Sequence, residues 1–145
     1  MSFVAEASIE LDVPPEVAFD VLCDHPSWSR WMPRSFEVAS RADTPLHAGK
    51  RLRIRVARAP VATGIVVTVV DRPREITWRG GARGVLHAEH RFLFSSAGPG
   101  RTKVQSHETW TGALAPLVRR FVKPAAERIG SEQLSGLAAA CLARR

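Results

Sequence analysis

The sequence contains only two cysteines, Cys23 and Cys141, and they lie far apart with no Cys-x-x-Cys spacing. This scarcity argues against the disulfide framework that staples many small secreted domains. Both cysteines fall on the apolar side of helix-like segments. We therefore expect two reduced, buried thiols.

Long hydrophobic runs are also missing. The first residues, MSFVAEASIELD, lack the basic segment and the apolar stretch of a secretory signal. The most apolar late stretch, GLAAACLA, is far shorter than the roughly 20 residues needed to cross a bilayer. We expect a cytoplasmic protein without stable membrane insertion. Its 145 residues suit a single domain, residues 1–145, whose core needs no disulfide or metal.

Lysine is scarce as well. The chain has a net charge of +7, and only three of its basic residues are lysines. A positive charge can attract nucleic acid or anionic membranes, but here the arginines are spread along the chain. The densest set, RLRIRVAR at 51–58, alternates arginine with apolar residues. This alternation is typical of a strand with one solvated face, so no nucleic-acid partner is expected.

The residues that are present predict the element order β-αα-β6-α. Turn residues separate the strands, and the short connections between them predict an antiparallel meander. Strands are expected at 3–11, 35–42, 50–58, 63–71, 74–80, 84–95 and 101–111, and short helices at 13–24 and 25–33. A long amphipathic helix is expected from 114 onward, kinked or interrupted at Pro124. Its expected apolar side comprises Leu114, Leu117, Val118, Phe121, Ala125, Ile129, Leu137 and Cys141.

The alternation of apolar and polar residues assigns the strand residues to two faces of the sheet. Residues that face each other in an antiparallel pair have a constant index sum, and a turn centred near Gly98 makes this sum even for the last two strands. Even positions then face even positions. We expect one even-numbered interior face across the six strands that follow the helix pair.

The run HAEHRFLF at 87–94 places two histidines and a glutamate in a stretch that is otherwise apolar. By parity, His90 shares the interior with Phe92, whereas His87 and Glu89 point outward. A metal site needs several ligands that converge on one point. Because the two histidines are split across the sheet, no metal is expected.

Across the last hairpin, the index sum places Ser106 or Glu108 opposite His90. Each of these polar side chains is costly to bury without a partner. Either His90 and Glu108 satisfy each other as a structural pair, or they line a cavity and orient a bound molecule. Such a pair can also transfer protons near neutral pH. However, no nucleophile elbow, phosphate loop or dinucleotide fingerprint supports catalysis independently, and no cofactor is expected.

The four tryptophans allow two interpretations. Trp78 and Trp110 face inward by parity, and Trp28 and Trp31 lie on the short second helix. Tryptophan is by default a core residue, but indole rings around a concavity also form stacking walls for a flat ligand.

Two parts of the sequence resemble one family. The segment VPPEVAFDVLCDHPSWSRWMP resembles the P-x-x-V-(F/W)-x-x-L-x-D … W … W-x-P opening of the START-like, SRPBCC superfamily. ITWRGG followed by AEHRFLF, and then GRTKVQSHETWTGALAPLV, resemble the later strands and the helix entry of its polyketide cyclase/dehydrase-like branch. The resemblance implies an α+β helix-grip fold. In this fold a curved seven-stranded antiparallel sheet wraps around the long C-terminal helix and leaves an internal hydrophobic cavity.

The resemblance also implies a function, because members of the superfamily bind lipids, polyketides, quinones and similar molecules. We expect a hydrophobic, cyclic or aromatic small molecule in the cavity. Its expected contacts are Trp31, Ile54, Val66, Thr68, Trp78, His90, Phe92, Ser106, Glu108, Trp110 and Phe121. One alternative is an aromatase or cyclase that uses His90 and Glu108 for proton transfer, although the absence of tyrosine departs from cyclases that rely on phenolic groups. Another is a protein-interaction module that acts through the arginine-rich exterior. A homodimer is compatible with each of these three functions.

Overall fold

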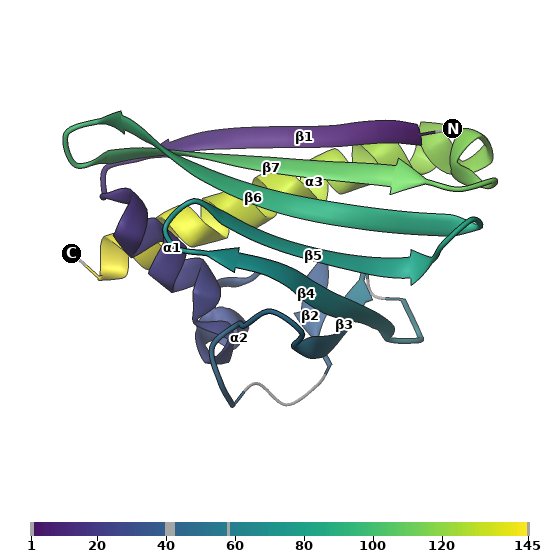
Figure 1. The fold of residues 1–145 in the computed structure, drawn as a ribbon, viewed down its shortest axis with the longest axis horizontal. Coiled ribbons are helices and arrows are strands. Elements are labelled where there is room, and N and C mark those ends of the chain that lie inside the picture. The colour runs from purple at the N-terminus through teal and green to yellow at the C-terminus, as the bar shows by residue number, and fades with distance from the viewer. Residues whose placement is uncertain (1, 40–42, 58, 145) are drawn as a thin grey trace.

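The computed structural model describes residues 2–39, 43–57 and 59–144. Seven strands and a long helix contain most of them (Figure 1). The strands are β1 (Ser2–Leu11), β2 (Phe36–Val38), β3 (Arg51–Val56), β4 (Thr63–Asp71), β5 (Glu75–Ala82), β6 (Leu86–Gly98) and β7 (Arg101–Thr111). The predicted order of elements is confirmed. Parts of three predicted elements, at 40–42, 58 and 145, lie outside the described residues.

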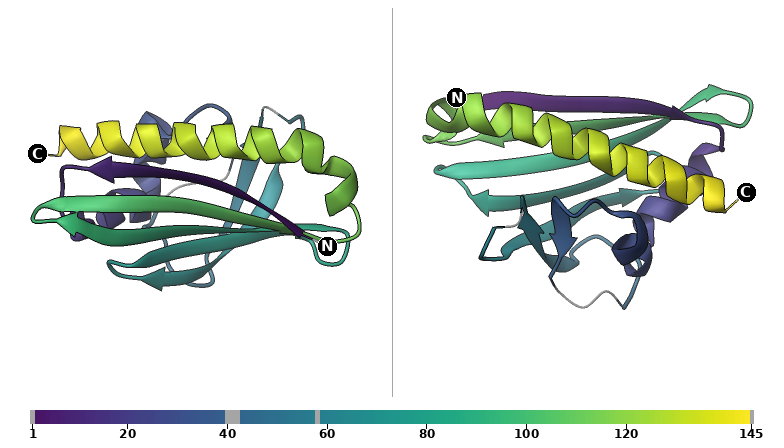
Figure 2. Two further views of the ribbon diagram at one scale, coloured as in Figure 1. Left: turned by 90° about the horizontal axis from the view of Figure 1, so that it is seen from above. Right: turned by 180° about the vertical axis from the view of Figure 1, so that it is seen from behind.

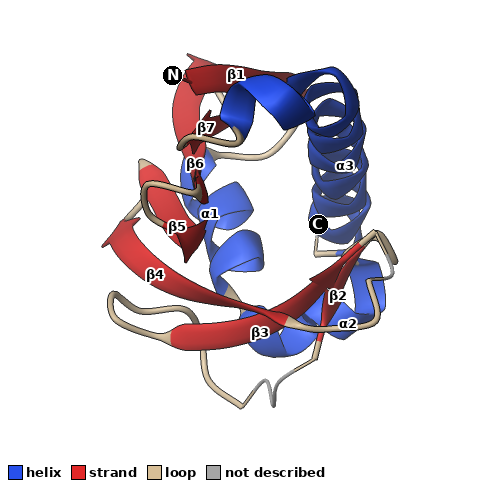
Figure 3. Ribbon diagram, turned by 90° about the vertical axis from the view of Figure 1, so that its right-hand side faces the viewer, coloured by secondary structure: helices blue, strands red, loops and turns tan. Residues whose placement is uncertain are grey.

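The strands form one antiparallel sheet in the order β1-β7-β6-β5-β4-β3-β2. The N-terminal strand β1 pairs with β7 along its length, from Ser2 opposite Thr111 to Leu11 opposite Thr102. Because twist accumulates from strand to strand, the sheet curls, and Figure 3 shows it curving from β1 round to β2 and β3 with the long helix alongside. This is the predicted helix-grip arrangement.

The predicted helix pair covers one end of the concave face. Helix α1 (Pro15–Cys23) starts with a proline, whose missing N–H is not needed in the first helical turn. A 3-10 turn, η1 (His25–Ser27), leads into the short helix α2 (Trp28–Trp31). The indole of Trp28 is completely buried, and its Nε1 donates a hydrogen bond to the carbonyl of Leu22 at 2.8 Å. This contact fixes the turn between the two helices.

The long helix α3 (Ala115–Ala143) runs along the open side of the sheet, mainly against β1, β7 and α1. Pro124 lies inside it and cannot donate the usual helical hydrogen bond. The helix continues through this residue, but Figure 2 shows its first turns at an angle to the remainder. No helix in the described part of the chain is long and apolar enough to cross a membrane.

The two halves of α3 differ in how closely they approach the sheet and the helix pair. A methyl group at Gly130 would come within 3.2 Å of the hydroxyl of Ser106, and Gly136 lies directly against the backbone of Trp31. Glycine therefore permits close packing in the C-terminal half, where Leu134 and Leu137 are buried.

The predicted apolar side of α3 is wrong for its N-terminal end. Leu114, Leu117 and Phe121 are exposed, by 40%, 70% and 68% of their surface. These residues continue the helical spacing of the apolar side, but this end of α3 projects beyond the tightly packed part of the core. Both cysteines are free, as expected, although Cys23 is only half-buried. Burial raises the pKa of the Cys141 thiol to about 11.

The predicted even-numbered interior holds for most strands but fails in β4. Leu52 of β3 lies opposite Ile65 of β4, so their index sum is odd and the inward residues of β4 become Ile65 and Val67. An irregularity between Val67 and Val69 then shifts the register and returns the inward position to an even number at Val70, which is paired with Ile76. A β-bulge of this kind adds one residue and inverts the parity.

Candidate functional site

A cavity of about 470 Å³ lies between the concave face of the sheet and α3. Most of the side chains that line it are apolar or aromatic. The lining residues are Phe36, Ile54, Val56, Ala57, Thr63, Ile65, Trp78, Gly80, Gly81, Leu86, Ala88, His90, Glu108, Trp110, Phe121, Val122, Ala125, Ala126, Ile129 and Gln133. Such a hollow, apolar with a few polar groups, is typical of a small-molecule site.

The cavity has an open end and a closed end along α3. Phe121, which lines it near the start of the helix, is largely exposed, whereas Gln133, three turns further along, is only 2% exposed. At 1.5 Å per residue, this stretch of helix is about 18 Å long. A ligand that enters beside Phe121 would therefore meet Gln133 last.

His90 is held in the wall of the cavity by contacts on every side. Its Nδ1 lies 3.0 Å from Oε2 of Glu108, its partner across the β6–β7 ladder. Its Nε2 lies 2.7 Å from the hydroxyl of Ser106. The ring of Phe92 stacks on the imidazole at 4.3 Å, and Trp78 meets it edge-on at 5.4 Å. These contacts restrict the orientation of the imidazole.

A neutral imidazole satisfies both polar contacts of His90. With its hydrogen on Nδ1, it donates to the Glu108 carboxylate and accepts from the Ser106 hydroxyl. Glu108 also lines the cavity. A carboxylate in such a wall can accept a hydrogen bond or a proton from a bound molecule. The parity argument had placed Ser106 or Glu108 opposite His90, and both contact it.

Six of the eleven predicted ligand contacts line the cavity. They are Ile54, Trp78, His90, Glu108, Trp110 and Phe121. Their positions make contact with a ligand feasible, and their binding role remains a prediction.

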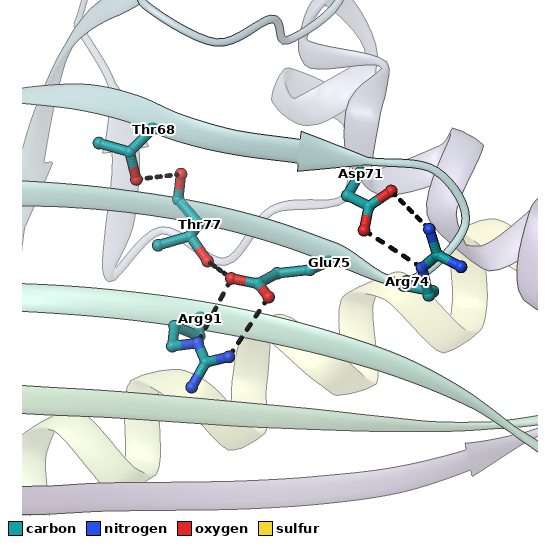
Figure 4. A network of polar contacts seen from close by, with 6 residues as sticks. All are labelled: Thr68, Asp71, Arg74, Glu75, Thr77 and Arg91. Carbon is teal, nitrogen blue, oxygen red and sulfur yellow. Dashed lines mark hydrogen bonds and ion pairs between the residues drawn. The ribbon is translucent and has the colours of Figure 1, made fainter.

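Two predicted contacts, Val66 and Thr68, lie outside the cavity because of the register of β4. Val66 lines a hollow on the outer face of the sheet, together with Arg51 and Arg79. The hydroxyl of Thr68 donates to the carbonyl of Thr77, at 3.4 Å, and belongs to a polar network on strands β4 to β6 (Figure 4).

The same network binds Glu75 to two partners. The Thr77 hydroxyl donates to the Glu75 carboxylate at 2.6 Å, and Arg91 pairs with it at 3.3 Å. The hydrogen bond from Arg91 is the main reason that the pKa of Glu75 is lowered. The polar groups of Thr68, Glu75, Thr77 and Arg91 therefore already have partners within the sheet.

Three further predicted contacts support the site without lining it. Phe92 is buried behind His90, and Ser106 is buried beneath α3, where Gly130 approaches its hydroxyl. Trp31 lies on α2 against Gly136, and its indole donates to the Ser27 hydroxyl at 3.1 Å. These positions depend on how α3 docks, which strand parity cannot specify.

Sequence reasoning missed Gln133. The expected apolar side of the long helix contains Ala125, Ile129 and Leu137, and Gln133 continues their four-residue spacing. A polar residue inside an apolar helical stripe is a detectable signal. Both of its amide atoms are buried without a hydrogen-bond partner among the described residues.

The outer face of the sheet has a hollow lined by positively charged side chains. His87 points away from the cavity, as predicted, into the hollow that Arg51, Arg53, Arg79 and Arg83 also line. Burial, followed by the charges of Arg83 and Arg79, lowers the pKa of His87. Within the described ranges, no group of three or more histidine, cysteine, aspartate or glutamate side chains is arranged to hold a metal ion.

Comparison with known proteins supports the fold. The family model described as "Polyketide cyclase / dehydrase and lipid transport" matches residues 2–142. A search of curated proteins finds no match. Among solved structures, the Zhui aromatase/cyclase from Streptomyces sp. R1128 has a TM-score of 0.74 at 15% identity, over 99% of this chain and 96% of that one.

Two other solved structures have the same architecture. A START superfamily protein from Mycobacterium smegmatis has a TM-score of 0.72 at 17% identity, with 98% of this chain and 99% of that chain covered. Norcoclaurine synthase from Thalictrum flavum, in complex with dopamine and hydroxybenzaldehyde, has a TM-score of 0.72 at 10% identity and covers 100% of this chain and 89% of its own. At such identities, the likeness extends to the fold alone.

Proposed function

Because the chain belongs to the family of polyketide cyclases, dehydrases and lipid transport proteins, we propose that it binds a hydrophobic, cyclic or aromatic small molecule between the sheet and α3. The observation that carries this proposal is the apolar cavity of about 470 Å³ with His90 and Glu108 in its wall. Burial of apolar surface would supply the affinity, at about 25 cal/mol per Å² before the costs of association. Glu108 would orient the polar part of the ligand.

The structural neighbours are consistent with an aromatic ligand. One is an aromatase/cyclase, and another is in complex with dopamine and hydroxybenzaldehyde. In this chain, Trp78 and Trp110 line the cavity and offer flat surfaces on which a ring can stack.

A bulky substitution inside the cavity tests this proposal. Ala126 lines the cavity, whereas Ala139 lies on the exposed side of the same helix. A panel of cyclic and aromatic ligands is titrated by calorimetry and by thermal melting. We expect at least one ligand to raise the melting temperature of the wild type, because a ligand at 100 times its Kd stabilises by about 2.7 kcal/mol. Ala126→Phe should weaken that binding by about ten-fold or more, and Ala139→Phe should leave it unchanged. Equal binding by both variants would contradict the cavity as the site.

A second candidate function is catalysis of the aromatase or cyclase type. It is favoured by the continuous chain from Ser106 through His90 to Glu108, which would let Glu108 accept a proton while His90 stabilises the change in charge.

Glu108→Gln separates catalysis from binding. The amide keeps the shape of the side chain but cannot accept a proton from the substrate. If Glu108 is a general base, turnover of a cyclisable substrate should fall by about 100-fold or more, while the Kd of an unreactive analogue changes little. A variant that loses affinity and turnover in the same proportion would point to orientation by hydrogen bonding alone.

A further inference from the structure

The Gln133 side chain is buried at the closed end of the cavity. It is 2% exposed, and neither its amide oxygen nor its amide nitrogen has a hydrogen-bond partner among the described residues. A buried amide without partners costs free energy comparable to a lost hydrogen bond or more. A leucine or methionine in this apolar stripe would avoid that cost. Packing alone therefore does not explain the presence of an amide at this position.

Trp110, near the end of β7, repeats the pattern in the wall that the sheet forms. Its indole stacks against Phe3 at 6.1 Å, and its Nε1 is buried without an acceptor among the described residues. Trp110 lines the same cavity as Gln133. Two residues that line one hollow, from β7 and from α3, thus carry buried polar atoms without partners among the described residues.

The charges around the cavity restrict the partner. None of the described lining residues is lysine or arginine, and Glu108 contributes a carboxylate. An anionic head group would therefore find no lysine or arginine to pair with and would share the hollow with the Glu108 carboxylate, which is unfavourable. The partner of the Gln133 amide should be uncharged.

We propose that Gln133 is a ligand-recognition residue that selects molecules whose leading end is neutral and offers a hydrogen-bond donor beside an acceptor. The Gln133 side chain is itself a primary amide, with one oxygen acceptor and two N–H donors. Carboxamides, lactams and hydroxy-carbonyl groups offer the complementary donor and acceptor. The Trp110 indole would donate to an oxygen further along the same molecule. This inference rests on the proposed cavity binding and adds a chemical class to it: neutral, oxygenated ring compounds, with fatty-acid anions excluded.

Four naphthalene derivatives with one ring system test the selection. 2-Naphthamide offers a donor and an acceptor, 2-acetylnaphthalene an acceptor only, 2-ethylnaphthalene neither, and 2-naphthoate a negative charge. Calorimetric titration of the wild type should give the tightest binding for the amide, by about ten-fold over the ethyl compound, and the weakest for the naphthoate.

Gln133→Met removes the amide but keeps the length of the side chain. This variant should bind the amide and the ethyl compound equally, and it should melt several degrees higher without ligand because the unpartnered polar group is gone. Ser135→Met, at an exposed position of the same helix, should keep the wild-type preference and melting temperature.

The outcomes separate this inference from the proposed function. If the wild type binds the ethyl compound as tightly as the amide, the role of Gln133 is overturned while cavity binding stands. If the wild type binds none of the four compounds, and Ala126→Phe and Ala139→Phe behave alike in the wider panel, the proposed function fails as well. The wild-type series decides the question even if Gln133→Met does not fold.

Discussion

At the scale of single residues, buried polar side chains divide into those with partners and those without. His90 lies in the sheet with Ser106 and Glu108 as partners, whereas His25 is completely buried against Trp28 with neither ring nitrogen hydrogen-bonded among the described residues. The first arrangement can serve a ligand. The second makes His25 a determinant of stability.

His25 should make the protein less stable in mild acid. Burial, reinforced by the charge of Lys50, lowers its pKa from 6.5 to about 4. Between these values the unfolded chain binds a proton at His25 that the native protein excludes. The free energy of unfolding should therefore fall as the pH drops from about 6.5 towards 4, by up to about 3 kcal/mol, and stay level with respect to this group above 6.5.

Urea denaturation at several pH values measures this effect. His25→Leu should flatten the decline between pH 6.5 and 4. His47→Leu, which removes an exposed histidine, should follow the wild type. An unchanged pH profile in His25→Leu would show that other groups cause the loss of stability.

At the scale of secondary-structure elements, register decides which residues reach the cavity. In β4, the odd index sum with β3 turns Val67 inward, where it is completely buried, and Val66 outward. The irregularity after Val67 then restores the parity of the next strands. A bulge in one strand is sufficient to exchange the two faces.

Paired substitutions test this register. Val67→Asp would bury an unpaired carboxylate and should cost several kcal/mol of unfolding free energy. Val66→Asp, beside Arg51 and Arg79 on the outer face, should change it by no more than about 1 kcal/mol. Urea denaturation of the two variants measures both values, and a larger loss for Val66→Asp would contradict the register.

At the scale of the whole molecule, one end is closed and the other is open. The C-terminal half of α3 lies close to the sheet and the helix pair at Gly130 and Gly136, whereas the N-terminal end exposes Leu117 and Phe121. The cavity lies beside the transition between these two regions. The same asymmetry that makes room for a ligand should also make the open end the less stable one.

Hydrogen exchange should reveal this gradient. Amides at 129–141 of α3 should exchange at least about ten-fold more slowly than those at 117–122, because the former are held by buried packing. A ligand in the cavity should slow exchange at 121–126 most. Uniform exchange along α3 would contradict the division into an open and a closed half.

Much of this protein follows from local pattern. Alternation and turn residues predicted every strand, and helical spacing predicted the first and the last helix, because both report which face of an element is apolar. The short second helix was predicted from the prolines at its two ends. Local pattern also placed Ser106 or Glu108 opposite His90, and the structure pairs His90 with Glu108. The turn between Gly98 and Arg101 alone would give an odd index sum, and the irregularity between Ser96 and Gly98 makes the sum even along the rest of β6 and β7.

Only the tertiary structure decided what depends on contacts between distant elements. The inward residues of β4 depend on a bulge, the exposure of Phe121 on where α3 leaves the sheet, and the site of Gln133 on how closely Gly130 and Gly136 let that helix approach. Local sequence specifies which face of an element is buried, but the cavity is a space left between elements. Its shape is set by the distances between them, and those distances are determined by the packing of the whole molecule.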